Sequence, residues 1–232
     1  MEQKLKILKL GGAIVTDKSI GAFEKFREDK IIELCETISE NYKDLILVHG
    51  AGSFGHPHVQ MFGLKDPLAI SKIHNACLKL NYRICDELVK RNVPVLPIHP
   101  LEGIDLSLIC KVLSMNFLPV LHGDVKIEEK GFRVISGDEI AVKLAKELKA
   151  KYLGFATDVE GVYINGRIVD VFDRSMIKSV GISGAKTDVT GGMRKKLEMI
   201  FELDKTKVFI FKGTAENVRK FLNLQKVGTM VI

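Results

Sequence analysis

The sequence predicts an α/β fold, a three-layer αβα sandwich built on a central, mostly parallel sheet. Candidate strands and helices alternate along all 232 residues, which is the pattern of parallel strands joined by helices. Several candidate strands are unbroken apolar runs, such as "DLILV", as expected of strands that are buried on both faces. No Pro- or Ser-rich linker divides the chain, so we expect a single domain over residues 1–232.

Candidate strands and two candidate helices account for most of the first half of the chain. Residues 4–10 read as a short strand that stops at two glycines. Apolar residues recur at helical spacing in 28–42 and in 67–92, and Pro67 suits the first turn of the longer helix. The other candidate strands are expected to be buried: 44–48, 93–98 and 117–121.

The second half continues this alternation and adds two hairpins. Residues 125–135 are expected to turn near Gly131, and 162–171 at Asn165-Gly166, a dipeptide that is typical of tight hairpins. The remaining candidate elements alternate in type: helix 137–150, strand 151–156, helix 191–203, strand 207–211, helix 215–222 and strand 228–232.

The composition argues against several classes of function. The net charge of +6 is dispersed, tryptophan is absent and no basic stripe is interleaved with aromatic residues, so we expect no nucleic-acid partner. The four cysteines lie far apart without a C-x-x-C, which predicts reduced, buried thiols rather than a zinc site or disulfides. No apolar stretch approaches the ~18 residues that cross a bilayer, and the N-terminus lacks a signal-peptide core. We therefore expect a soluble, cytoplasmic protein with no membrane partner.

Glycine-rich turns follow several candidate strands. Taken singly, each is more simply a reversal of the chain, but each also has a lysine, histidine or aspartate close by. Bare backbone N–H groups at the end of a strand can bind an anion, especially where a helix begins. The phosphate motifs G-x-x-x-x-G-K-[ST] and G-x-G-x-x-G are missing, so phosphate binding would use another scaffold. The turns are 9–18, 48–58, 122–124 with 136–141, and 157–163 with 188–196.

The order of these turns resembles the amino acid kinase superfamily. "KLGG", "HGAG", "SGDEIAVKLA", "TDVEGVY" and "TGGM" carry the resemblance, which covers nearly the whole chain. "TDK", "HGAGSFGH" and "PVLHGDV" resemble the branch of isopentenyl phosphate kinases. The chain departs from the family pattern at Ala13, where "GGS" is common, and at Ala51, where "HGGG" is common; both side chains stay small.

The resemblance implies an enzyme that transfers the γ-phosphate of ATP to isopentenyl phosphate, giving isopentenyl diphosphate and ADP. Residues 1–150 would bind the acceptor and residues 151–232 the ATP. Magnesium would accompany ATP, held mainly by its phosphates because no dedicated carboxylate cluster is visible. The resemblance also implies a homodimer.

Five residues would carry the chemistry by their positions in the family. Lys9 and Lys196 would contact the phosphates of ATP, and Lys18 would reach the transferring phosphoryl group. Asp138 would orient the lysines by ion pairing, and His56 would donate a hydrogen bond to the acceptor's phosphate. Without the resemblance, these residues read as solvent-exposed lysines, a helix N-cap and a loop histidine.

The resemblance also implies two sets of binding residues. The acceptor's phosphate would be held by Ala51, Gly52, Ser53, His56 and Gly137. The nucleotide would be held by Lys9, Gly11, Gly12, Ala13, Gly52, Asp158, Gly161, Gly191, Gly192 and Lys196. An apolar wall for the acceptor's tail is expected on helix 67–91, although the same stripe reads as ordinary core: Ile70, Ile73, Cys77 and Leu80.

Two questions stay open at the level of the sequence. Lys195 is a rival to Lys196, which is expected in the first turn of helix 191–203, where the helix dipole disfavours a lysine unless an anion binds. The acceptor is the second question: another phosphate, a phosphonate or a carboxylate remains an alternative, as does a member that binds nucleotide without catalysis.

Overall fold

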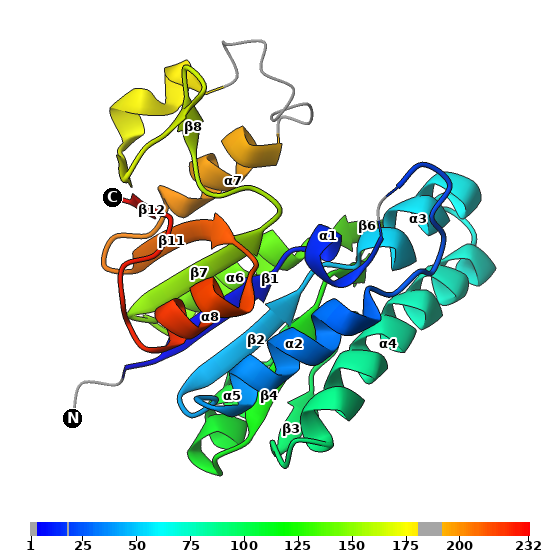
Figure 1. The fold of residues 1–232 in the computed structure, drawn as a ribbon. Helices are drawn as coiled ribbons and strands as arrows, with labels where there is room; N and C mark the ends of the chain where they lie inside the picture. The colour runs from blue at the N-terminus through cyan, green and yellow to red at the C-terminus, as the bar shows by residue number, and fades with distance from the viewer. Residues whose placement is uncertain (1–3, 18, 181–191) are drawn as a thin grey trace.

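A mixed, mostly parallel sheet forms the centre of the protein (Figure 1). The computed structural model describes residues 4–17, 19–180 and 192–232. Only the β11–β12 pair of this sheet is antiparallel within those residues. The strand order is β10 (Val171–Phe172), β12 (Thr229–Val231), β11 (Lys207–Lys212), β7 (Tyr152–Thr157), β1 (Lys6–Leu10), β2 (Leu45–His49), β4 (Leu118–His122) and β3 (Val95–Pro97). The predicted fold class is confirmed.

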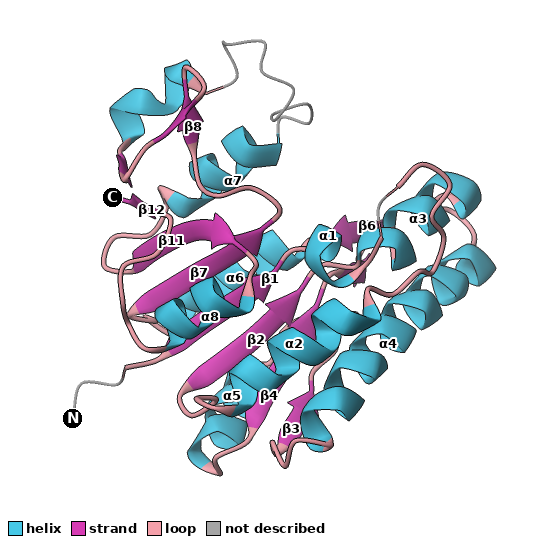
Figure 2. Cartoon of the chain, in the orientation of Figure 1, coloured by secondary structure: helices cyan, strands magenta, loops and turns pink. Residues whose placement is uncertain are grey.

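Helices cover both faces of this sheet (Figure 2). They are α1 (Gly12–Val15), α2 (Glu28–Ser39), α3 (His56–Phe62), α4 (Pro67–Val89), α5 (Leu106–Ser114), α6 (Gly137–Glu147), α7 (Gly192–Ile200) and α8 (Ala215–Leu222), with 3-10 turns η1 (Gly52–Phe54) and η2 (Arg174–Ser179). Two hairpins lie outside the main sheet: β5 (Asp124–Glu128) with β6 (Gly131–Ile135), and β8 (Tyr163–Ile164) with β9 (Arg167–Ile168).

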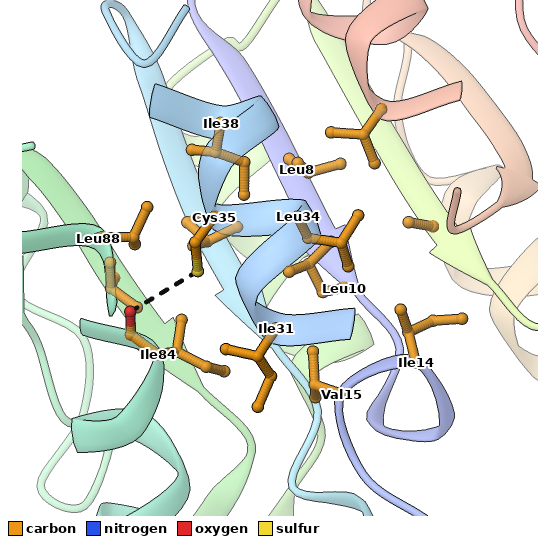
Figure 3. Close-up of a cluster of buried hydrophobic side chains, with 14 of the residues drawn as sticks. Leu8, Leu10, Ile14, Val15, Ile31, Leu34, Cys35, Ile38, Ile84 and Leu88 are labelled. Atoms are coloured by element: carbon orange, nitrogen blue, oxygen red, sulfur yellow. Dashed lines mark hydrogen bonds between the residues drawn. The ribbon is translucent and has the colours of Figure 1, made fainter. Parts of the chain in front are cut away.

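The alternation of side chains along β1 shows how the layers form. Leu8 and Leu10 point into the core beneath α2, α4 and α8, part of which Figure 3 shows. Ile7 points to the opposite face, into the core beneath α5, α6 and α7. Because successive residues of a strand face opposite sides, Lys9 lies on the same side as Ile7, toward α6 and α7.

Most predicted elements are present, with some departures. Residues 93–98 were expected to be buried, but β3 is an edge strand in which Val95 is half-buried and Pro97 exposed. Helices α1, α3 and α5 were not predicted; the N-cap of α5 is Asp105, whose carboxylate accepts a hydrogen bond from the N–H of Leu108. The predicted Asn165-Gly166 turn has both residues at positive φ, as a tight hairpin requires.

The cysteines are all free thiols, as the sequence predicts, but they are not all buried. Cys35, Cys77 and Cys85 are buried, whereas Cys110 on α5 is exposed. Burial raises the pKa of the Cys35 and Cys85 thiols to about 12, so both are protonated at neutral pH. Within the described residues, no helix has the length and apolar character needed to cross a bilayer.

A substitution at Gly154 on β7 tests how closely α8 packs against the sheet. A Cβ added at Gly154 would lie 2.8 Å from the Cε2 atom of Phe221, which is fully buried. Gly154→Ala should therefore lower the free energy of unfolding by about 1–3 kcal/mol, measured by chemical denaturation. In Gly154→Ala/Phe221→Leu the loss should be smaller than the sum of the single losses, since the smaller side chain makes room. An unchanged free energy of unfolding in Gly154→Ala would contradict this packing.

Candidate active site

The carboxyl ends of four adjacent strands meet at one edge of the sheet. Strands β1, β2, β4 and β7 run parallel there, and the predicted glycine and aspartate turns follow each of them directly. Ligands of open α/β sheets bind beyond the carboxyl ends of the strands, so this edge is the expected place for a site.

The turns after β1 and β2 pack backbone against backbone, which explains their glycines. A Cβ on Gly12 would lie 2.6 Å from the backbone N of Gly52, and one on Gly50 would lie 2.7 Å from the N of Gly12. Thr16 joins the two turns, because its hydroxyl donates to the Gly12 carbonyl and accepts the N–H of Ser53. Side chains larger than hydrogen at Gly12 or Gly50 would push the turns apart.

One carboxylate holds two lysines together beside these turns. Lys9, at the end of β1, has its Nζ 2.6 Å from Oδ1 of Asp138. Lys196 on α7 has its Nζ 3.1 Å from Oδ2 of the same residue. The Lys196 ammonium also lies 4.8 Å from the centre of the Phe155 ring on β7, within range of a cation–π interaction. Both lysines are buried, with about 7% of each residue exposed.

Burial and pairing oppose each other in this cluster. Burial alone would raise the pKa of Asp138, but the charges of Lys9 and Lys196 outweigh it and hold that pKa well below its usual range. Burial lowers the pKa of Lys196 to about 8, against the opposing pull of Asp138. The Asp138 carboxylate is therefore ionised at neutral pH. A further negative charge near Lys196 would stabilise the charged form of its amine.

The N-terminus of α6 places Asp138. The N-cap of α6 is Ser136, whose hydroxyl accepts the N–H of Glu139, so the reading of Asp138 as an N-cap is wrong. Asp138 lies in the first turn instead, and its side chain is left to pair with the lysines. A Cβ on Gly137 would lie 2.9 Å from the His49 carbonyl O and 3.3 Å from Cε of Lys9, so only glycine lets α6 approach this closely.

Lys195 and Lys196 differ in burial and in their contacts. Lys195 is exposed on α7, whereas Lys196 is buried against Asp138. Lys196 is the fifth described residue of α7, so the expectation that it lies in the first turn is wrong. Packing explains the register, because Leu197 and Ile200 point from the same helix into the core.

A cleft of about 750 Å³ opens beside the turn that follows β2. His56, exposed at the start of α3, lines it together with Gly52 and Ser53. The N–H of Ser53 already donates to Thr16, which departs from the expectation that it holds an acceptor's phosphate. The rest of the lining is Ser19, Gly21, Ala22, Phe23, Pro57, Gln60 and Met61.

The other predicted residues have varied surroundings. Asp158 is exposed just after β7, and its charge acts on Lys196. Gly161 is buried, and an added Cβ would lie 2.5 Å from Oγ1 of Thr229, so packing alone accounts for this glycine. Gly11 is the N-cap of α1, and Gly12 and Ala13 are its first two residues. Gly192 is exposed where the described part of α7 begins. Lys18 and Gly191 lie outside the described residues.

Sequence reasoning missed a polar network at the ends of β2 and β4. The buried rings of His49 and His122 stack with their centres 5.6 Å apart. Nε2 of His122 lies 2.8 Å from Nδ1 of His99, and Nδ1 of His74 lies 2.7 Å from Oδ2 of Asp124. Burial lowers the pKa of His49 to about 4, so that ring is neutral at pH 7. Single histidines in a strand or helix carry no spacing signal that would have revealed this arrangement.

The titration of Lys196 tests the geometry of the charged cluster. The Lys196 amine should titrate near pH 8, well below the 10.5 of an ordinary lysine, when followed by the NMR shift of its Cε carbon. Asp138→Asn should lower this midpoint further, because the carboxylate favours the charged form. The NMR signal that disappears in Lys196→Arg is the one that belongs to Lys196. A titration midpoint near pH 10.5 for Lys196 in the wild-type protein would contradict the ion pair between buried Lys196 and Asp138.

Comparisons with known proteins show which family the chain resembles. Residues 4–212 match the model of the amino acid kinase family. The isopentenyl phosphate kinase of Methanocaldococcus jannaschii is 36% identical, with 98% of each chain covered. The isopentenyl phosphate kinase of Thermoplasma acidophilum is 31% identical, and the match covers 98% of this chain and 100% of that protein. The crystal structure of the T. acidophilum enzyme as a product complex superposes with a TM-score of 0.81 at 26% identity, covering 98% of this chain and 100% of the other.

The match to the family model spans most of the chain, including Lys9, Asp138 and Lys196. The similarity to the first of these relatives extends over nearly the full length of both proteins. The chain belongs to the amino acid kinase family.

Proposed function

We propose that this protein transfers the γ-phosphoryl group of ATP to isopentenyl phosphate, giving isopentenyl diphosphate and ADP. The observation that carries the proposal is the convergence of the buried Lys9 and Lys196 on one half-buried carboxylate, that of Asp138, at the edge of the sheet. The similarity to several isopentenyl phosphate kinases supports the choice of acceptor.

The reaction brings two phosphates together, and their repulsion is the main obstacle. An oxygen of the acceptor's phosphate forms a bond to the γ-phosphorus as the bond to the bridging oxygen of ADP breaks. No general base is needed, because a phosphate monoester is already largely ionised near neutral pH. Lys9 and Lys196 would stabilise the negative charge that the two phosphates share, and Asp138 would keep both ammonium groups in place.

The acceptor would bind on the α3 and α4 side of the site. His56 lines the cleft beside Gly52 and would donate a hydrogen bond to the acceptor's phosphate. Ile70, Ile73 and Cys77 of α4 form an apolar cluster with Val125, and Ala51 of the glycine turn packs against it. The side chains of this cluster are buried and none of them lines the cleft beside His56, so the expected apolar wall reads as core. Leu80, the fourth residue of the expected stripe, belongs to the main core.

ATP would bind on the side of residues 151–232, near Asp158, Gly192 and the turn after β1. Magnesium, when bound, would neutralise charge on the triphosphate. We propose that the phosphates of ATP carry this ion. Among the residues that the structure describes, no group of three His, Cys, Asp or Glu side chains is placed to hold a metal. The homodimer stays a prediction of the family resemblance, and the cytoplasmic location stays a prediction from the composition.

A panel of acceptors tests this function. The purified protein, with ATP and magnesium, should release ADP rapidly with isopentenyl phosphate and slowly or not at all with fosfomycin or acetylglutamate. A coupled assay for ADP measures this release. Robust turnover of another acceptor without turnover of isopentenyl phosphate would refute the proposal, and nucleotide binding without ADP formation would indicate a non-catalytic member.

His56→Ala tests the acceptor side of the site. This exposed side chain contributes little to the core, so the free energy of unfolding should hardly change. Loss of a donor to the reacting phosphate should lower kcat/KM for isopentenyl phosphate by about 100-fold. Gln60→Ala, which removes another exposed polar side chain from the same cleft, is the matched control. Near-normal kinetics in His56→Ala would remove the assigned role.

A further inference from the structure

A loop forms the wall of the cleft that faces α3. Residues 19–26 contribute Ser19, Gly21, Ala22 and Phe23 to the lining. We propose that Glu24, at the base of this wall, is a positioning residue that fixes the loop and α3 relative to each other through His58 and Lys79. The inference rests on the proposed function, because it concerns how the acceptor's binding site is held.

Ser53 fastens the loop to the glycine turn along the backbone. The N–H of Glu24 donates to the Ser53 carbonyl over 3.1 Å. The Ser53 hydroxyl accepts the N–H of Lys25 at 3.2 Å and lies 3.3 Å from the Lys25 carbonyl, to which it can donate. Glu24 adopts φ of +46°, a left-handed conformation that glycine or asparagine would take at less cost. Lys149 and Leu224 also adopt positive φ, so the case for the Glu24 carboxylate rests on its contacts.

The Glu24 carboxylate bridges two helices. Its Oε1 lies 2.9 Å from Nε2 of His58 on α3, and its Oε2 lies 2.8 Å from Nζ of Lys79 on α4. Burial alone would raise the pKa of Glu24, but the hydrogen bonds from Lys79 and His58 bring it below its usual value. The carboxylate is therefore ionised at neutral pH and joins the loop to both helices through charge-assisted hydrogen bonds.

Two aromatic rings, one from the loop and one from α3, pack around His58. His58 is only 3% exposed, and Phe23 of the loop stacks on it with ring centres 4.3 Å apart. Phe62, also on α3, lies 5.9 Å away. The loop therefore holds α3 in two ways, through a carboxylate and through a stacked ring.

Fixing His58 also fixes the direction of His56. The two residues lie two positions apart on α3, so their side chains point about 200° apart around the helix. His58 is buried toward Glu24, and His56 is exposed at the cleft. If the pair with Glu24 is broken, α3 can rotate and the loop can lift, which would move His56 away from the acceptor's phosphate.

Steady-state kinetics of Glu24 variants test the proposal. Glu24→Ala should raise KM for isopentenyl phosphate by about tenfold and leave KM for ATP nearly unchanged, because only the acceptor's side is disturbed. His58→Ala should have a similar effect, and the double variant should be little worse than either single one, since all three remove the same contact. Glu24→Gln, which keeps the shape and one acceptor oxygen, should restore part of the affinity. Glu40→Ala is the matched control, because it breaks a bidentate pair with Arg219 on α8.

Hydrogen exchange of the substrate-free protein provides a readout that does not depend on the acceptor. Exchange in residues 19–26 and 56–62 should become faster in Glu24→Ala and Glu24→Gln, but not in Glu40→Ala. Unchanged exchange in those segments, or an equal rise of both KM values, would overturn the positioning role. An inactive wild-type protein would instead contradict the proposed function, and the exchange result would still decide whether Glu24 holds the loop.

Discussion

The site depends on a single carboxylate that two lysines share. Lys9 and Lys196 would repel each other if they were buried side by side without Asp138 between them. Three features of the fold place these groups: the alternation along β1 turns Lys9 toward α6, the N-cap Ser136 starts α6 at Gly137, and packing sets the register of α7. The parallel sheet brings all three to one edge.

Close backbone packing is the second constraint on the site. The glycine turns after β1 and β2 touch through their main chains, and a single hydroxyl, that of Thr16, joins them. These contacts bring the turn that follows Lys9 against the turn that contributes Gly52 to the cleft. The same turns would leave backbone N–H groups near the phosphates, as a scaffold without the common phosphate motifs requires.

Much of this could be predicted from the sequence, and the failures have physical causes. Long elements such as α4 and buried strands such as β2 have strong periodic or apolar signals. The seven-residue α3 is too short for such a signal, and β3 resembles a buried strand although it forms an edge. The pair of Glu24 with His58 joins residues 34 positions apart, and only the folded chain brings them together. Choosing Lys196 over Lys195 needed the packing of Leu197 into the core.

The most direct measurement is a crystal structure of the protein with a non-hydrolysable ATP analogue and isopentenyl phosphate. The shared carboxylate should still hold both lysines, with Nζ of Lys9 and Nζ of Lys196 within hydrogen-bonding distance of the phosphates that face each other. Phosphates bound away from this cluster, with Lys9 and Lys196 closed on Asp138 and touching neither ligand, would contradict the central claim.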